Sequence, residues 1–312
     1  MPSHHAFLIL CHKQPRQINA LTGLFAPHTD RTGVFAHVDV KFARILRDLV
    51  PRTNLEAFSR HRMNWGGFGI VRATVDLLRR ALARRPYDFI HLLSGQCLPL
   101  RPVPQLMAFF DELDAECMPS TPFPVNGLPY RGFDRILVDY PPHLQGRYRG
   151  AKAKQLEDYK ESVLRDPSRH RNVDHLPPLH HGSQWFSVSG ACATWMLDFL
   201  DAQPDYAEFF ATSLIPDEMF FHTLLMASPF ASRQDSRTFR YMDWKRGGPY
   251  TFTCEDLPAL LDTDMLFARK FDIGKDEAVV AGLLRTLHLR AVKPSLSVPA
   301  LLEATRGVTT LD

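Results

Sequence analysis

The sequence predicts an α/β fold in which a mostly parallel central sheet is flanked by helices. Three short apolar runs, at residues 6–11, 34–38 and 88–93, have the length and composition of strands that are buried on both faces. The segments between these runs repeat apolar residues at helical spacing. Strands that alternate with helices across short turns are typical of βαβ units, which place neighbouring strands parallel.

The predicted elements of the first half follow in a regular order. The run AFLILC leads into HKQPRQINALTGLF, a helix pattern in which Pro15 stands where a first turn tolerates proline. After the strand VFAHV, the segment FGIVRATVDLLRRALAR predicts an amphipathic helix whose basic residues gather in its last turns, where the helix dipole favours them. The third strand, DFIHLL, ends at the turn SGQCLPLRP.

The second half is less regular. Residues 119–181 are rich in Pro, Arg, Tyr and His and contain one predicted helix, AKAKQLEDYKESVLRD, so we expect an insertion that lines a cleft. A strand (SQWFSVS) and two helices (GACATWMLDFLDA and DEMFFHTLLMAS) follow, and VPALLEATRG predicts a weak helix near the end. We therefore expect one catalytic domain over residues 1–285, with the insertion inside it, and a tail over residues 286–312.

Composition and charge narrow the class of protein. The 312 residues are 45% hydrophobic and 23% charged, as in soluble globular proteins, and the net charge of +3 is too small to indicate a nucleic-acid partner. The five cysteines are scattered, which is typical of a reducing compartment. The first apolar run is too short for a signal peptide or a membrane span. We expect a cytoplasmic protein without a transmembrane segment, either free or at the inner face of a membrane.

Polar residues follow the three predicted strands, where an open α/β sheet binds its ligands. They include His37, Asp39 and Ser94, which stand in the stretches HVDVK and SGQC. Two interpretations of Asp39 remain open. It accepts hydrogen bonds from a nucleotide base or ribose, or it is a solvated strand end.

No metal site is indicated. The turn LLSGQCLPL lacks the hard anionic ligands that Mg²⁺ or Mn²⁺ requires, and the only Asp-x-Asp triplet, at residues 262–264, is expected on the surface. Histidines gather at positions 170, 175, 180 and 181, but no cysteine lies near enough to complete a familiar zinc spacing. We expect a Pro-rich loop with scattered histidines.

The stretch NWGGFGIV lacks the GxGxxG order of a dinucleotide-binding turn, which disfavours an NAD-dependent enzyme. Its adjacent glycines would let a ligand approach the backbone closely. We expect a tight entry into the following helix, with Trp65 packed inside.

Two basic stretches come late in the chain. RYMDWKRGG contains Arg246, and LFARKFD contains Arg269 and Lys270 between two phenylalanines that should hold their side chains in place. They form either a solvated basic face or a set of fixed cations. Fixed cations suit a diphosphate leaving group, because negative charge grows on it as its bond breaks.

The stretch LIPDEMFFHTLL carries two adjacent acids. Asp217 follows a proline and is expected to be the N-cap of a helix, with Glu218 in the first turn. Glu218 is then either part of a helix start or a catalytic base, since a helix N-terminus keeps a carboxylate ionised and able to accept a proton.

These stretches together resemble the Core-2/I-branching enzymes and peptide O-xylosyltransferases of glycosyltransferase family 14. The resemblance covers about residues 4–275, and the segment 119–181 is the least matched. It runs in order through HAFLILCHKQP, FAHVDVK, NWGGFGIVRATVDLLRRAL, DFIHLLSGQCLPL, GSQWFSVS, PDEMFFHTLL, YMDWKRG and LFARKFD.

The resemblance implies a GT-A-type fold and an inverting glycosyltransferase that uses a UDP-sugar without a divalent metal or other cofactor. It makes Glu218 the catalytic base and Asp39 the acid of the nucleotide pocket. It also implies that Trp185 lies beside the donor sugar or the acceptor. The residues matched to the diphosphate-binding cations are Arg246, Arg269 and Lys270.

Two departures bear on the choice of sugar, because Cys97 and Gln184 stand where the family often has acids. We expect GlcNAc or xylose as the donor sugar and a hydroxyl of a glycan, glycolipid or peptide as the acceptor. A soluble bacterial-type enzyme of surface or capsular glycan synthesis fits the sequence. The alternative is a catalytically inactive protein that binds glycans or nucleotide sugars on the same fold.

Overall fold

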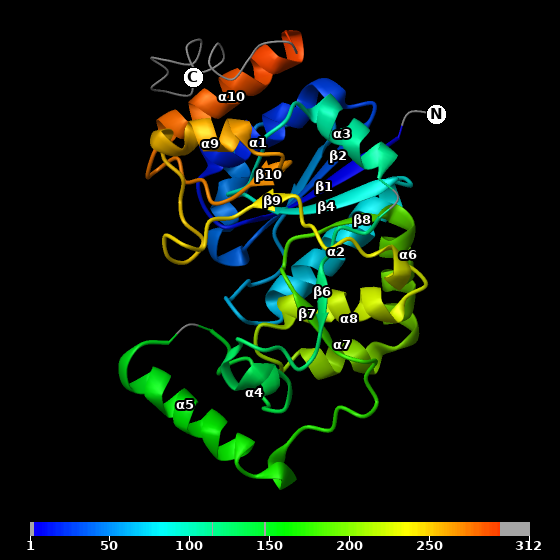
Figure 1. Ribbon diagram of the computed structural model, residues 1–312, viewed down its shortest axis with the longest axis vertical. Coiled ribbons are helices and arrows are strands. Elements are labelled where there is room, and N and C mark those ends of the chain that lie inside the picture. Colours follow the sequence, from blue (N-terminus) through cyan, green and yellow to red (C-terminus); the bar gives the residue numbers. More distant parts are fainter. Residues whose placement is uncertain (1–2, 114, 147, 294–312) are drawn as a thin grey trace.

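The computed structural model describes residues 3–113, 115–146 and 148–293. Its central sheet has the strand order β3-β2-β1-β4-β8, in which β8 is antiparallel to β4 and the other neighbours are parallel. The strands are β1 (His5–Cys11), β2 (Thr32–Val38), β3 (Leu55–Phe58), β4 (Phe89–Ser94) and β8 (Ser187–Ser189). The predicted α/β fold with a mostly parallel sheet is confirmed (Figure 1).

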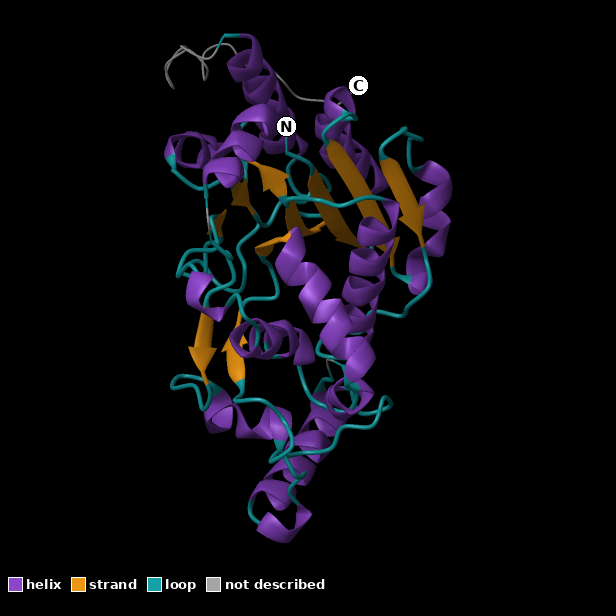
Figure 2. Ribbon diagram, turned by 90° about the vertical axis from the view of Figure 1, so that its right-hand side faces the viewer, coloured by secondary structure: helices purple, strands orange, loops and turns teal. Residues whose placement is uncertain are grey.

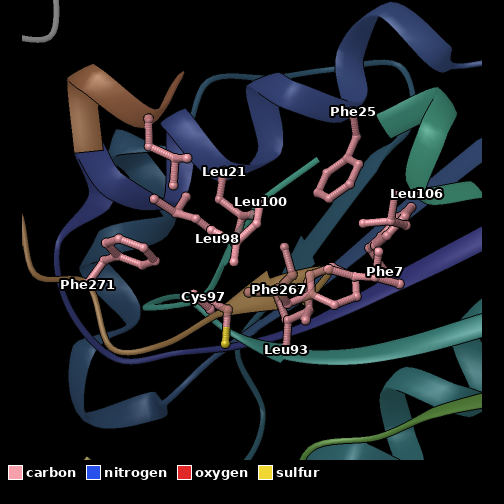
Figure 3. Close-up of a cluster of buried hydrophobic side chains, with 14 of the residues drawn as sticks. Phe7, Leu21, Phe25, Leu93, Cys97, Leu98, Leu100, Leu106, Phe267 and Phe271 are labelled. Carbon is pink, nitrogen blue, oxygen red and sulfur yellow. The ribbon is translucent and has the colours of Figure 1, made fainter. Parts of the chain in front are cut away.

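Helices cover both faces of this sheet. The flanking helices are α1 (Pro15–Phe25), α2 (Gly69–Arg84), α3 (Val103–Glu112), α6 (Gly190–Ala202), α7 (Pro204–Phe210), α8 (Phe220–Ala227), α9 (Leu257–Asp262) and α10 (Glu277–Val292). Because strand side chains alternate between faces, β1 sends Phe7 and Ile9 into one core and Leu8 into the other. Figure 3 shows the first core, where Phe7 and Phe25 lie near Leu106 and Phe267.

Two smaller sheets connect the remaining segments. In the first, β10 (Phe267–Ala268) pairs with β5 (Leu98–Pro99) and β9 (Arg240–Tyr241), which joins the late basic stretches to the turn after β4. In the second, β6 (Ser120–Pro122) pairs antiparallel with β7 (His180–Gly182). This pair stands apart from the central sheet in Figure 2.

The predicted insertion begins and ends at the β6–β7 pair. Between these strands lie α4 (Phe133–Ile136) and α5 (Gly150–Leu164), and α5 occupies the end of the molecule farthest from α10 (Figures 1 and 2). The two strands close the insertion at its base, so the chain between them can extend away from the sheet without disturbing it.

Short 3₁₀ turns complete the path. They are η1 (Ala26–His28), η2 (Val40–Asp48), η3 (Pro129–Gly132), η4 (Pro167–Arg169), η5 (Pro216–Glu218), η6 (Ala231–Arg233) and η7 (Cys254–Asp256). Among the described residues, no helix combines the length and the apolar character needed to cross a membrane.

Some boundaries differ from the sequence expectation. The strand expected over residues 183–189 is limited to β8, and the helix expected from residue 217 begins at Phe220. Helix α10 continues through residue 285, the proposed end of the domain, so no secondary-structure boundary coincides with it. The weak helix expected at residues 298–307 lies outside the described residues, and the division into domain and tail stays a prediction.

The expectation that Trp65 packs inside is wrong, because its side chain is 47% exposed. The expected tight turn before α2 is present. A Cβ on Gly69 would lie 1.9 Å from the Arg62 carbonyl oxygen, and Gly66 has a φ of +71°. Backbone packing at the glycines therefore shapes this turn, and the indole is left on the surface.

Candidate active site

Glu218 ends the single 3₁₀ turn η5, which is fixed to the glycine turn described above. Ile215 enters η5 with a left-handed backbone (φ 51°), and its N–H donates to the Gly66 carbonyl at 2.9 Å. The Glu218 N–H in turn donates to the Ile215 carbonyl at 3.3 Å. Glu218 therefore has a rigid backbone mount, as expected, but the mount is η5 and not a long helix.

The expectation that Asp217 caps a helix is wrong. The turn begun by Pro216 stops after one turn, and α8 starts at Phe220 with Met219 at its N-cap and no side-chain cap. Asp217 is thus too early in the chain to reach the free N–H groups of α8. Its side chain is buried instead, and in the described part of the chain its Oδ1 has no hydrogen-bond partner.

The Glu218 carboxylate has two partners, both on Oε2. Arg135 Nη1 donates to it at 2.7 Å, and His181 Nε2 lies 3.2 Å from it. The Glu218 side chain is 34% exposed, whereas the Arg135 side chain is only 9% exposed. Oε2 is therefore held by protein groups, while Oε1 has no hydrogen bond to any described residue.

The two adjacent acids have opposite pKa shifts. Burial raises the pKa of Glu218, but the His181 hydrogen bond and the charge of Arg135 outweigh burial and lower that pKa overall. Burial, followed by the charge of Glu218, raises the pKa of Asp217 to about 7. Glu218 therefore stays ionised at neutral pH, and its neighbour carries a proton through much of the acidic range.

Sequence reasoning missed both partners of Glu218. Arg135 lies in α4, and His181 lies in β7, where it pairs with Thr121 of β6. His181 had been considered only as one of four clustered histidines. No local pattern marks either residue, because each reaches Glu218 only through the fold of the insertion.

At the strand edge, His37 and Asp39 are buried and already partnered. His37 Nε2 accepts the N–H groups of Arg60 (3.2 Å) and His61 (2.9 Å), and burial lowers its pKa to about 4. Asp39 accepts the Lys41 N–H at 3.0 Å and pairs with Lys41 Nζ at 3.1 Å. The neutral His37 ring therefore holds the loop after β3 through these two hydrogen bonds. Asp39 is buried, so the alternative of a solvated strand end is wrong.

Ser94 belongs to the turn after β4. Its hydroxyl accepts the Gln96 N–H at 3.2 Å and lies 3.3 Å from Cys97 Sγ. Gln96 also bonds to both backbone groups of Phe271, which joins this turn to the LFARKFD stretch.

Positive charge gathers at the same edge of the sheet. Burial lowers the pKa of His12, and the charges of Lys13, Lys270 and Lys41 lower it further, with Asp39 opposing them. Lys13 is paired with Asp272 and Lys41 with Asp39, so carboxylates at the same edge offset part of this charge. Of these three lysines, only Lys270 was predicted from the sequence to be a binding cation.

The structure brings together Arg269 and Trp185, two residues that the sequence had suggested separately. The Arg269 guanidinium lies over the buried Trp185 ring, 4.4 Å from its centroid. Arg269 Nε is buried and has no hydrogen-bond partner within the described ranges. A cation–π contact with Trp185 therefore holds the Arg269 guanidinium in place.

Arg246 has two carboxylates as partners. Its guanidinium donates to Asp243 at 2.6 Å and pairs with Asp256 at 2.7 Å, above the Tyr250 ring. These partners raise the pKa of Arg246 and offset its charge. An anionic ligand would therefore have to compete with both carboxylates for Arg246.

The four clustered histidines do not converge. His170 contacts the Leu164 carbonyl, His175 packs on Phe209, and His180 Nδ1 lies 2.8 Å from the Pro178 carbonyl, while only His181 reaches Glu218. Over the described ranges, no group of three or more His, Cys, Asp or Glu side chains is placed to hold a metal ion.

Comparisons with known proteins agree on one family. The model of the Core-2/I-branching enzyme family matches residues 5–261. The chain is also similar to xylosyltransferase 1 from human, chimpanzee and dog, with 22% identity over an alignment of 246 residues that covers 70% of this chain. The match covers only 23% of the length of those relatives. The chain belongs to the Core-2/I-branching enzyme family, which is a family of glycosyltransferases.

Proposed function

We propose that the protein is an inverting glycosyltransferase that moves a sugar from a UDP-sugar to an acceptor hydroxyl. The observation that carries this proposal is the environment of Glu218. Its carboxylate is ionised, and one oxygen is fixed by Arg135 and His181 while the other has no hydrogen bond to a described residue. A positioned carboxylate with a free oxygen is what a general base for a hydroxyl requires.

In this mechanism Glu218 Oε1 accepts the proton of the acceptor hydroxyl. The acceptor oxygen attacks the anomeric carbon from the face opposite UDP, and the bond from that carbon to the diphosphate oxygen breaks. Arg135 and His181 hold the carboxylate in place throughout. General base catalysis of this kind typically contributes about 10²–10⁴-fold to the rate.

The strand edge would bind the donor. Lys13, Lys41 and Lys270 would supply positive charge for the departing diphosphate, with Lys13 and Lys41 releasing Asp272 and Asp39. Arg269, which lies over Trp185, directly precedes Lys270 in the chain. Asp39 would accept hydrogen bonds from the ribose or the base, with His37 and Ser94 shaping the pocket wall. Arg246 would bind the diphosphate in place of its present partners, the carboxylates of Asp243 and Asp256.

The family resemblance supports the proposed substrates. GlcNAc or xylose is the proposed donor sugar, and the reaction needs no divalent metal or other cofactor. The acceptor is a hydroxyl of a glycan, glycolipid or peptide in surface or capsular glycan synthesis. We place the reaction in the cytoplasm or at the inner face of the membrane.

A UDP-release assay tests the proposal. The purified protein is incubated with UDP-GlcNAc, UDP-xylose, UDP-glucose or UDP-galactose, with and without EDTA. Release of UDP from one donor, unchanged by EDTA, is the expected result. Failure to release UDP from any donor while UDP still binds would favour the inactive binding protein, and loss of activity with EDTA would contradict the metal-free reaction.

A further inference from the structure

Exposed apolar side chains are concentrated in three short segments of the surface. In the described part of the chain, six large apolar or aromatic residues are exposed. Four of the six lie in these segments, with Phe42 and Val50 in residues 40–50, Trp65 in residues 60–66 and Trp244 in residues 243–250. We call the three the rim segments. Single exposed apolar side chains are ordinary, but a concentration of them indicates an interaction surface.

The first two rim segments are bonded to each other. Lys41 Nζ donates to the Met63 carbonyl at 3.0 Å and to Asn64 Oδ1 at 3.2 Å. The Val40 N–H also donates to the His61 carbonyl at 3.2 Å. Side-chain and backbone bonds therefore hold residues 40–50 against residues 60–66.

The third rim segment reaches the same place through Lys270, whose N–H donates to the Tyr250 carbonyl at 3.2 Å. Lys270 lies close enough to His12 for its charge to lower the pKa of that imidazole. The His12 ring in turn lies 6.4 Å from the ring of Phe42 in the first segment. The rim segments thus surround the strand edge to which we assign the donor.

Positive charge is concentrated in the same segments. They contain seven Lys or Arg residues and two Asp residues, which gives a net charge of +5. The net charge of the whole chain is +3, so the remaining residues together carry a net charge of −2. The rim segments are therefore basic against a weakly acidic remainder.

Four of these cations are exposed and have no partner among the described residues, either by hydrogen bond or by ion pair. They are Arg44, Arg47, Arg62 and Lys245. Each rim segment thus combines at least one exposed apolar side chain with at least one free cation.

An anionic lipid bilayer matches this combination. The headgroup region of a bilayer takes up aromatic side chains, which have an apolar body and tolerate contact with water at one end. Anionic headgroups attract Lys and Arg, and the long stems of these residues can lie along the apolar boundary. A small soluble anion would explain the free cations but would leave the indoles in water.

We propose that the rim segments bind an anionic lipid bilayer, with their aromatic side chains in the headgroup region and their free cations on the lipid phosphates. The inference deepens the proposed function, and it rests on that function only for the placement of the reaction at the inner face of the membrane. Binding of this kind would hold the strand edge beside the bilayer, within reach of a glycolipid acceptor.

Vesicle co-sedimentation tests the role of charge. The wild type should bind vesicles of phosphatidylcholine with about 30% phosphatidylglycerol and should not bind pure phosphatidylcholine vesicles. Arg44→Gln/Arg47→Gln should bind the anionic vesicles more than about tenfold more weakly, because each cation near the surface contributes about fivefold to affinity. Arg131→Gln/Lys154→Gln, which removes two exposed cations of the insertion, is the matched control and should bind like the wild type.

Tryptophan fluorescence tests the role of the aromatic side chains. Anionic vesicles that contain lipids brominated near the headgroup should quench the wild type, because Trp65 and Trp244 would enter the bilayer. Trp65→Ser/Trp244→Ser should lose most of this quenching and bind more weakly, with an unchanged melting temperature, since both residues are exposed. Trp195→Phe, which alters a half-buried tryptophan of α6, is the control and should keep the quenching.

The outcomes keep the two proposals apart, because vesicle binding needs neither a donor nor the Glu218 base. If no donor releases UDP but the vesicles bind as expected, the proposed function fails and the bilayer surface stands. If UDP is released but the wild type ignores anionic vesicles, or binds neutral ones equally well, the bilayer surface is overturned. Equal losses in the rim and insertion charge variants, or binding without quenching, also overturn it, since the chain would then adsorb as to any polyanion.

Discussion

The strand edge and the insertion contribute to the same candidate site, but they position their charged groups by different means. At the strand edge, Asp39 and Lys41 pair two residues apart, directly after a buried strand. In the insertion, Arg135 and His181 reach Glu218 across 83 and 37 residues of chain. The first arrangement follows from strand order, whereas the second exists only once the insertion has folded against η5.

The difference suggests that the strand edge and the Glu218 environment have separate functions, and experiments can test this. A donor site at the strand edge should respond to mutation through affinity for UDP. The Glu218 environment should respond through turnover and its pH dependence. The predictions below run from the largest expected effect to the smallest.

Glu218→Gln should lower kcat at least 100-fold, because the amide cannot accept the acceptor proton. Calorimetry should show UDP binding close to that of the wild type. Glu161→Gln, which alters an exposed glutamate paired with Arg165 on α5, is the control. Near-normal turnover of Glu218→Gln would remove Glu218 from the mechanism.

Arg135→Ala should lower kcat by about one to two orders of magnitude and shift the acidic limb of the rate profile to higher pH. The positive charge of Arg135 helps to lower the pKa of Glu218, so its removal raises that pKa and the base is protonated at a higher pH. The measurement is kcat/KM against pH.

Arg171→Ala provides the matched control for Arg135. Arg171 lies in the same insertion, but it bonds to Ser213 Oγ and the Phe209 carbonyl, away from Glu218. Its loss should lower the melting temperature without moving the acidic limb. A shift of the limb in both variants would show that the insertion acts as a whole and that Arg135 has no specific role.

Lys270→Ala should weaken UDP binding about tenfold and change kcat less, because Lys270 belongs to the positive cluster around His12. Titration calorimetry at low and high salt measures the effect, which should shrink as salt screens the charge. Lys275→Ala is the control, since its ammonium bonds to the Thr251 carbonyl and lies over Tyr250. Equal losses in both variants would mean that the general positive charge, and not this cluster, binds UDP.

His37 and His222 should each lower the stability of the protein as the pH drops below about 6.5, and Asp217, whose folded-state pKa is raised to about 7, should partly offset this loss. Burial lowers the folded-state pKa of His37 and of His222 to about 4, so the unfolded chain binds more protons than the folded one between pH 6.5 and 4. Stability from both groups is therefore complete above pH 6.5 and declines as the pH falls towards 4. Each pKa unit corresponds to about 1.4 kcal/mol.

Urea unfolding at pH 7.5 and pH 5 measures this decline in stability. His37 tests the strand edge, and His222 tests the insertion, since its ring contacts Ser120 Oγ and the Ser183 carbonyl at the β6–β7 pair. His37→Asn and His222→Asn should each make the unfolding free energy less dependent on pH. The same pH dependence in the wild type and in both histidine variants would contradict the shifts.

The sequence was a good guide wherever a pattern repeats over several residues. The apolar runs of β1, β2 and β4 and the amphipathic pattern of α2 were enough to predict the parallel core of the sheet and one of its flanking helices. The short strand β3 was missed, because four half-buried residues carry no clear alternation.

The candidate site was less predictable. Glu218 was identified through family resemblance, whereas Arg135 and His181 come from irregular chain whose path depends on long-range contacts. Asp217 was wrongly predicted to be a cap because an acid after proline fits the local sequence pattern of an N-cap. That pattern does not show that η5 ends after a single turn. Trp65 was misread because size and apolarity say nothing about which face of a glycine turn an indole takes.

The β6–β7 pair has a consequence for how such a protein changes in evolution. These two strands fix the ends of the insertion, so lengthening the chain between them adds little entropic cost. His181, within β7, would keep its place beside Glu218 through such changes, whereas Arg135 keeps its place only if α4 is retained. Two three-residue strands and one short helix thus hold the partners of Glu218, and the chain between α4 and β7 can vary in length around them.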